Sequence, residues 1–289
     1  MNFLYERITY IFDPLHHHWE QEKIYRKISV ALVLFFLSYL VVIEIKRQGL
    51  LGHEVFDVIP TNHFYAISSA FTVVLILEVI SLVFTLPCSF SKSVGKQFEI
   101  LSLILLRNAF KELQNFPEPL TYAGNEEAIL RIASDGFGAL LIFALLGYYY
   151  IVQAKASEET MRPTDLYAFV AAKKGIALLL LFTFIYMGIN NLFDSLAGRE
   201  HDDFLHQFYT MLILSDILVV LIAQCFQPSF QAMFRNSGFA LSTLMIRIAL
   251  AAPPFYNVLL GLAAAVFAIL LTQISMSLFI KPRSKARET

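Results

Sequence analysis

Four charged residues lie inside apolar stretches of the chain: the carboxylates Glu78 and Asp216 and the guanidinium groups Arg107 and Arg247. A lone charge at the centre of a bilayer costs at least about 2.5 to 3.5 kcal/mol on insertion scales, so intramembrane charges are normally paired or exposed to water. We therefore expect two acid–base pairs, Glu78 with Arg107 and Asp216 with Arg247. Such pairs could form the path or gate of a small cation or a proton, or they could only fix how the helices pack.

The two expected pairs are not equivalent along their helices. Glu78 precedes Pro87 by nine residues, whereas Asp216 precedes Pro228 by twelve. The difference of three residues is about one helical turn, so the pairs are expected at different depths. Glu99 is eight residues before the arginine of the first pair, on a similar helical face, and is a candidate fifth member of the ion path.

Acidic residues gather in two segments that we expect to face the outside of the cell. Glu54 and Asp57 lie in the first segment, and Glu200 and Asp203 lie in the second; Asp135 is expected on the same side. Concentrated negative charge raises the local concentration of cations, so the first four residues are candidates for an acidic outer mouth. An ordinary solvated loop surface is the alternative interpretation.

Histidines next to the second acidic segment give a weak signal for a metal site. His201, Asp202 and His206 offer nitrogen and oxygen ligands of the kind that divalent metals bind. The two histidines are five residues apart, which is not the i, i+4 spacing that places two ligands on one helix face. We therefore expect no bound metal and no other cofactor.

Familiar catalytic motifs are absent from the sequence. The chain has no glycine-rich phosphate loop, no Cys-x-x-Cys pair and no Gly-x-Ser-x-Gly nucleophile motif. Its histidines lie in or beside polar segments, whereas a haem held between membrane helices needs axial ligands inside them. We expect a protein that is not an enzyme, and an intramembrane enzyme is the third alternative.

The composition identifies the elements that must hold these residues. Of the 289 residues, 57% are hydrophobic and only 16% are charged, which departs strongly from a soluble domain. Several runs approach or exceed the roughly 18 to 20 apolar residues that cross a bilayer as a helix. These runs are 28–45, 64–87, 136–153, 176–192, 208–226 and 255–280. The sequence therefore predicts an all-α integral membrane protein in contact with the lipid bilayer.

The apolar segments recur in the two halves of the chain. Residues 26–39 align without a gap with residues 173–186, and residues 101–107 align with residues 241–247, each ending in an arginine. Further short matches occur in the same order in both halves. Internal repeats of membrane helices are a common way to build transporters and channels, with sites at the repeat interface. We therefore expect two tandem repeats.

Two shorter segments, 95–113 and 237–252, decide the number of membrane crossings. Each contains one of the two intramembrane arginines, and they occupy equivalent places in the repeats. If they are elbow helices in the plane of the membrane, the chain has six spans. If they are true spans, it has about eight. Short cytoplasmic loops are enriched in lysine and arginine, so the positions of these residues can separate the two topologies.

The eight-span topology gives the sharper charge asymmetry. It places 15 lysines and arginines on the side of the N-terminus and 5 on the other side, against 14 and 8 for six spans. The larger set is Arg7, Lys23, Arg26, Lys27, Lys92, Lys96, Lys155, Arg162, Lys173, Lys174, Arg235, Lys281, Arg283, Lys285 and Arg287, and the smaller set is Lys46, Arg47, Lys111, Arg131 and Arg199. We therefore favour eight helices with both termini in the cytoplasm, in the plasma membrane or in the inner membrane of a bacterium.

This topology divides the chain into five segments. They are an interfacial N-terminal segment (1–25), a first transmembrane repeat (26–156), a cytoplasmic linker (157–172), a second transmembrane repeat (173–280) and a basic C-terminal tail (281–289). The first segment carries Trp19 and spaced apolar residues, a pattern typical of a helix that lies along the lipid headgroups. Small residues such as Gly138 and Gly147 allow close helix packing, between repeats or between the subunits of a homo-oligomer.

These features favour a channel- or transporter-like protein that moves a small ion, a cation or a proton. The main alternative is a membrane subunit or scaffold that transports nothing, in which the buried ion pairs are structural. In that alternative the basic tail binds a partner or anionic lipid, since each lysine or arginine near an anionic surface contributes about 1 kcal/mol. The sequence offers no feature that predicts nucleic-acid binding.

Overall fold

The computed structural model describes residues 2–49, 60–155, 163–196 and 204–279. Every regular element in these ranges is a helix, which confirms the predicted all-α class for the described part of the chain. The long helices are α1 (Asn2–Trp19), α2 (Glu22–Arg47), α3 (Phe64–Thr85), α4 (Phe90–Lys111), α5 (Glu126–Lys155), α6 (Pro163–Leu196), α7 (Phe204–Phe226), α8 (Phe230–Ala251) and α9 (Tyr256–Phe279), and the short 3-10 helix η2 covers Glu112–Asn115.

Six of the described helices are long and apolar enough to cross a membrane, namely α2, α3, α5, α6, α7 and α9. A helix of about 20 residues is about 30 Å long, which matches the hydrocarbon core of a bilayer. The chain is therefore a multi-pass helical membrane protein. Helices α4 and α8 are not among the six, and both contain arginine together with several other polar residues.

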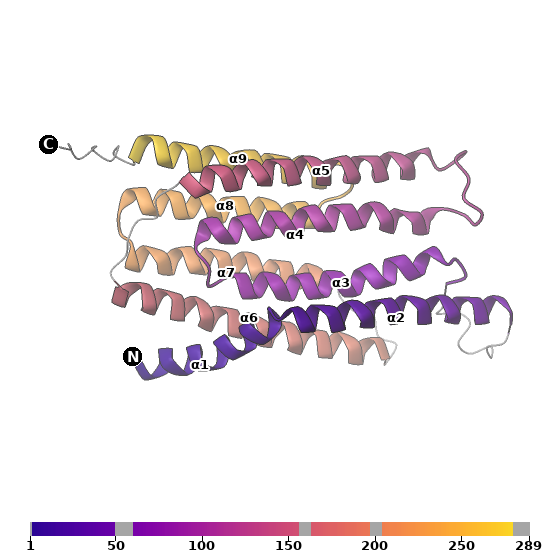
Figure 1. The fold of residues 1–289 in the computed structure, drawn as a ribbon, viewed down its shortest axis with the longest axis horizontal. Coiled ribbons are helices and arrows are strands. Elements are labelled where there is room, and N and C mark those ends of the chain that lie inside the picture. Colours follow the sequence, from indigo (N-terminus) through magenta and orange to yellow (C-terminus); the bar gives the residue numbers. More distant parts are fainter. Residues whose placement is uncertain (1, 50–59, 156–162, 197–203, 280–289) are drawn as a thin grey trace.

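Helices α2 to α9 lie side by side along the long axis of the molecule and alternate in direction (Figure 1). The start of α1 and the end of α9 lie at the same end of the bundle. Helices α4 and α8 run along the apolar helices rather than across them (Figure 1). The six apolar helices and the two polar ones therefore form one bundle.

The two polar helices lie at the centre of this bundle. Helix α4 packs against α3, α5 and α8, and α8 packs against α7, α9 and α4, while α5 also packs against α9. Within each half, neighbours in sequence are neighbours in space, in the order α2–α3–α4–α5 and α6–α7–α8–α9. Leu101 and Leu105 of α4 and Ile246 of α8 are fully buried, whereas the apolar surface of α2 faces outward.

Glycines allow α5 and α8 to approach α9 closely. A Cβ atom added to Gly138 of α5 would lie 2.5 Å from a methyl carbon of Val258 on α9. A Cβ atom on Gly238 of α8 would lie 2.6 Å from Leu271 of α9. Real Cβ atoms do not approach side chains this closely, so both positions require the absence of a side chain.

The N-terminal helix is more deeply anchored than the interfacial segment predicted for residues 1–25. Helix α1 packs against α6, and α2 begins before residue 25. Phe12 is buried, and its ring centroid lies 5.8 Å from that of Phe84 on α3. Asp13 forms an ion pair with Lys174 of α6 at 2.5 Å. The apolar spacing of α1 therefore serves contact with protein.

Two helix boundaries differ from the sequence-based prediction. Helix α6 begins at Pro163, so much of the predicted linker 157–172 belongs to a membrane helix. Proline is favoured at the first position of a helix, where its missing N–H has no partner to lose. Helix α5 begins at Glu126, so Asp135 lies inside a helix rather than in a loop. Acidic residues in the first turn, including Glu127, favour this early start through the helix dipole.

Replacing Gly138 by alanine is expected to destabilise the fold. The added Cβ would collide with Val258, whose β-branched side chain has little rotamer freedom to move away. Overpacking of this kind costs roughly 1 to 3 kcal/mol, which exceeds the roughly 0.5 to 1 kcal/mol that alanine gains over glycine within a helix. Thermal unfolding of the purified protein in detergent measures the difference.

Gly147→Ala is the matched control on the same helix, because no atom lies within 4 Å of the position of its Cβ. We expect Gly147→Ala to unfold at or above the temperature of the original protein. An equal loss of stability in both variants would contradict the close contact between α5 and α9.

Candidate functional site

Among the described residues, the most deeply buried ion pair joins α7 and α8. Arg247 is only 2% exposed, and its Nε and Nη2 atoms lie 2.8 Å from Oδ2 of Asp216. Thr243 Oγ1 lies 3.1 Å from the same carboxylate oxygen. Thr243 precedes Arg247 by four residues, so both side chains project from one face of α8. The expected ion pair is present, and Thr243 adds a contact that a search for charged residues alone does not find.

The turns before the two arginine helices set where those helices begin. Ser229 is the N-cap of α8, and its side chain accepts a hydrogen bond from the backbone N–H of Ala232 at 3.2 Å. Ser89 has the extended backbone of an N-cap at the start of α4. Serine is favoured at such positions because its hydroxyl can satisfy a free N–H of the first turn. A fixed helix start gives the register that brings Arg247 opposite Asp216.

The first expected ion pair joins α3 and α4. A guanidinium nitrogen of Arg107 contacts Oε1 of Glu78. The two side chains are 25% and 12% exposed, respectively, so this pair is less enclosed by protein than the pair of Arg247. Both acid–base pairs expected from the sequence are thus present, each between two consecutive helices of one half.

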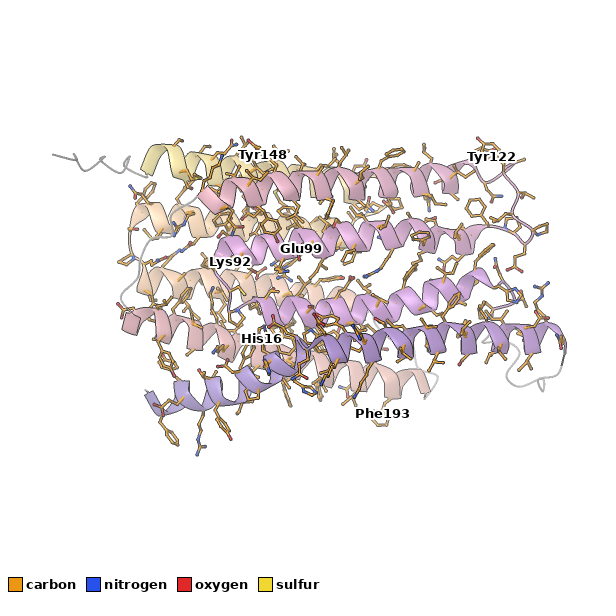
Figure 2. All side chains as sticks on the ribbon, viewed as in Figure 1. His16, Lys92, Glu99, Tyr122, Tyr148 and Phe193 are labelled. Carbon is orange, nitrogen blue, oxygen red and sulfur yellow. The ribbon has the colours of Figure 1, made fainter. Side chains whose placement is uncertain are left out.

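Glu99 does not share the cluster of the first pair. Its carboxylate accepts hydrogen bonds from Nζ of Lys96 at 2.7 Å and from the hydroxyl of Tyr150 at 2.6 Å. Figure 2 shows Glu99 on α4 in the same part of the bundle as Lys92. Eight residues of helix span about 12 Å, so a shared face does not bring Glu99 to Arg107. Glu99 is therefore not part of the Glu78–Arg107 pair, and its place in an ion path stays a prediction.

A buried lysine lies beside the second pair, in a place that the sequence did not indicate. Lys173 of α6 is only 2% exposed, although the sequence places it among the cytoplasmic charges. Its Nζ donates to the backbone carbonyl of Cys88 at 2.7 Å. The same nitrogen lies 4.6 Å and 4.7 Å from the ring centroids of Phe90 and Phe169. A carbonyl and two aromatic faces together stabilise a cation that has left water.

A small pocket connects this lysine with the ion pair of α7 and α8. The space open to the centre of a water molecule is about 20 Å³, and about 10 to 15 Å³ of such space is enough for one water. The pocket is lined by Leu86, Cys88, Phe90, Ser93, Lys173, Asp216, Val219, Ala240 and Thr243. It therefore brings a cation, a carboxylate and two hydroxyl groups to one water-sized space.

A second buried carboxylate lies between α5 and α9. Asp135 is buried, and its Oδ1 accepts a hydrogen bond from Nδ2 of Asn257 at 2.9 Å. The sequence predicts Asp135 in a polar loop, whereas the structure places it inside α5, which begins nine residues earlier. Asn257 lies in the first turn of α9, where polar side chains often bond to a neighbouring helix.

The candidates for an outer mouth and for a metal site lie mostly outside the described residues. Six of these candidates are outside the described ranges, namely Glu54, Asp57, Glu200, His201, Asp202 and Asp203. The described side chains also do not include that of His206. Among the residues that the structure describes, no group of three or more histidine, cysteine, aspartate or glutamate side chains could hold a metal ion.

A polar cluster ties the ends of α2 and α3 to the loop after α4. The ring nitrogens of His63 lie 3.2 Å from Glu44 and 3.1 Å from Glu118. Arg47 also pairs with Glu118 at 3.1 Å. Burial acts to raise the pKa of Glu118, but the hydrogen bonds from His63 and the charge of Arg47 outweigh it and hold the pKa below its ordinary value of 4.5.

No family model matches this chain, and no curated protein or solved structure matches it significantly. Its function must therefore be argued from the geometry of the two ion pairs, Lys173 and the pocket.

Neutralising one partner of the Asp216–Arg247 pair is expected to lower the stability of the fold more than neutralising both. Asp216→Asn or Arg247→Gln alone leaves a buried charge without its partner, which costs roughly 3 to 5 kcal/mol. The double variant removes that charge and should recover most of the lost stability. Equilibrium unfolding of the four proteins gives the coupling energy, and single-variant effects that simply add in the double variant would contradict the pairing.

The cluster of Glu118 is expected to loosen in acid. Because the folded-state pKa of Glu118 is lowered, its stabilising contribution is complete above pH 4.5 and is lost as the pH falls through the folded-state value. The unfolding temperature should therefore drop more steeply with acidification in the original protein than in Glu118→Gln. Glu6→Gln, on the exposed surface of α1, is the control and should keep the original slope. Parallel curves for all three proteins would refute the role of Glu118.

Proposed function

We propose that this chain is a channel- or transporter-like membrane protein that moves a small ion, a proton or another small cation, past its buried ion pairs. The proposal is carried by the Asp216–Arg247 pair between α7 and α8, with the water-sized pocket beside it. Ionisable groups inside membrane segments are costly, and they commonly mark ion and proton paths. Ser93, Lys173 and Thr243 line this pocket together with Asp216, and they are possible partners for a water molecule in it.

Unused hydrogen-bonding capacity in both pairs supports this role. Oε2 of Glu78 and Nη1 of Arg247 are buried and have no hydrogen-bond partner among the described residues. Buried polar atoms are nearly always bonded, and the exceptions in native proteins often occur at sites with a chemical role or at sites that hold water. A pair that only fixed helix packing would be expected to use all of its donors and acceptors.

The proposal includes eight membrane crossings in two tandem repeats. Helices α4 and α8 have 22 residues each, which gives a length of about 33 Å for a hydrocarbon core of about 30 Å. Their direction along the apolar helices supports true crossings rather than elbows in the membrane plane (Figure 1). The shared order of neighbours in the two halves supports a duplication, and α4 meets α8 at the interface between the halves.

The orientation and assembly of the protein are part of the same proposal. Both termini face the cytoplasm, and the protein lies in the plasma membrane or in a bacterial inner membrane, as the asymmetry of lysine and arginine favours. Glu54, Asp57, Glu200 and Asp203 then form an acidic mouth on the outer side, where they concentrate cations. The working form is a homo-oligomer.

A membrane subunit that transports nothing is the second candidate. It is favoured by the contacts of Lys173, because a carbonyl and two aromatic faces can hold this cation without any role in transport. In this alternative the buried charges fix the register of α6, α7 and α8. The two candidates differ in whether the charges matter once the protein has folded.

Ion flux through the purified protein in liposomes tests the proposal. The original protein should dissipate a proton or cation gradient faster than empty liposomes do. Asp216→Asn with Arg247→Gln should fold and change this flux by at least about tenfold, which corresponds to about 1.4 kcal/mol in the barrier. Glu127→Gln with Arg131→Gln removes an exposed i, i+4 pair of α5 and should leave the flux unchanged. No flux in any of these proteins, or equal flux in all, would favour the scaffold.

A further inference from the structure

We propose that the pocket between Lys173 and Asp216 is a proton-transfer site, so that the ion moved by this protein is a proton rather than a metal cation. This inference rests on the proposed function, because it names the ion at the same site. It follows from three properties of the pocket: the free donors of Lys173, the size of the space and the balance of charge.

Lys173 has more hydrogen-bond donors than its protein contacts use. An ammonium group has three N–H donors, and the carbonyl of Cys88 accepts one of them at 2.7 Å. No carboxylate of the described residues lies within ion-pair distance of this nitrogen, although Asp216 lines the same pocket. The geometry therefore leaves donor capacity on Lys173 for a molecule in the pocket.

The size and lining of the pocket fit water. The space open to the centre of a water molecule is about 20 Å³, and a buried water typically makes about three hydrogen bonds to polar groups around it. Four lining residues supply such groups, namely Lys173, Asp216, Ser93 and Thr243. The other lining residues are mostly apolar. A proton can cross such a space by exchange of bonds along a single water.

The balance of charge also disfavours a metal cation. Asp216 compensates Arg247, so the lysine gives the cluster a net charge of +1 when all three groups are ionised. A second cation would meet this positive charge in a medium of low dielectric constant, where repulsion is strong. The transferred proton leaves the net charge of the cluster unchanged, because it is already part of the Lys173 ammonium group.

The transfer is balanced within the cluster. An N–H bond of the Lys173 ammonium breaks and its proton binds the pocket water, which releases another of its protons to Asp216. Lys173 becomes a neutral amine and Asp216 a neutral carboxylic acid, while Arg247 keeps its charge, so the total charge stays at +1. Asp216 then releases its proton towards one side of the membrane and Lys173 binds another proton from the opposite side, which restores both groups.

Titratable and charged groups from every neighbouring element act on this site. They are Glu20 after α1, Cys88 between α3 and α4, Lys92 and Lys96 of α4, Asp216 of α7 and Arg247 of α8. Lys92 projects from the first half of α4 (Figure 2). Glu20, Lys92 and Lys96 act on Cys88, whose backbone carbonyl accepts the hydrogen bond of Lys173.

Parallel flux measurements in liposomes test the inference. The original protein should move protons and should not move potassium ions. Lys173→Arg keeps the positive charge but cannot release a proton at any accessible pH. It should lower the proton flux at least about tenfold, as should Lys173→Met. A Lys173→Arg variant with the original proton flux would overturn the proposal, because it would reduce the lysine to a structural cation.

Filling the pocket provides a test that leaves every charge in place. Ala240 lines the pocket, so Ala240→Leu should exclude the water and lower the proton flux by a similar factor. Ala251→Leu, at the exposed end of the same helix, is the control and should keep the flux. Equal proton flux in both leucine variants would overturn the proposal even if the Lys173 variants failed to fold.

The possible failures can be told apart. If the original protein moves potassium ions but not protons, the proposed transport function stands and the proton site is refuted. If it moves neither ion, the proposed function fails as well. Proton flux that is lost in Lys173→Arg and in Ala240→Leu but kept in Ala251→Leu supports both.

Discussion

The cost of placing charge in hydrocarbon organises this bundle. Helices α4 and α8 carry Arg107 and Arg247, and each arginine has its carboxylate partner on the preceding helix. A helix with such residues is stable only where protein covers its polar face, so α4 and α8 lie at the centre and meet each other there. The apolar helices, and α2 above all, face outward because they lose nothing in contact with lipid.

The same constraint explains which parts of the site the sequence could predict. A carboxylate and an arginine inside long apolar runs are conspicuous, and because neither is stable alone, their pairing follows from the charges themselves. The helical class and the six apolar crossings follow from hydropathy in the same way. These inferences need no knowledge of how the helices pack, and the two ion pairs and the all-α fold agree with them.

Contacts between distant parts of the chain determine the positions of the buried charges that the sequence could not predict. Lys173 and Lys174 are adjacent and look like an ordinary pair of cytoplasmic charges, but neighbours on a helix point about 100° apart. Lys174 reaches Asp13 on α1, whereas Lys173 turns into the bundle towards Cys88. Asp135 was misplaced for a related reason, because only the partner Asn257 on α9 makes a carboxylate acceptable inside α5. In both cases the deciding contact comes from a distant part of the chain.

The docking of α1 on α6 has a consequence for how the protein is made. Phe12 belongs to a core that also contains Ala177 and Phe184, residues that the ribosome adds only after the whole first half has been synthesised. Chains emerge and begin to fold from the N-terminus, so α1 must wait without its final partner while α2 to α5 are synthesised. Its exposed aromatic and basic residues suit a stay among lipid headgroups during that interval. The arrival of α6 then supplies the docking surface, so the first helix in the sequence reaches its place only after four later helices have been made.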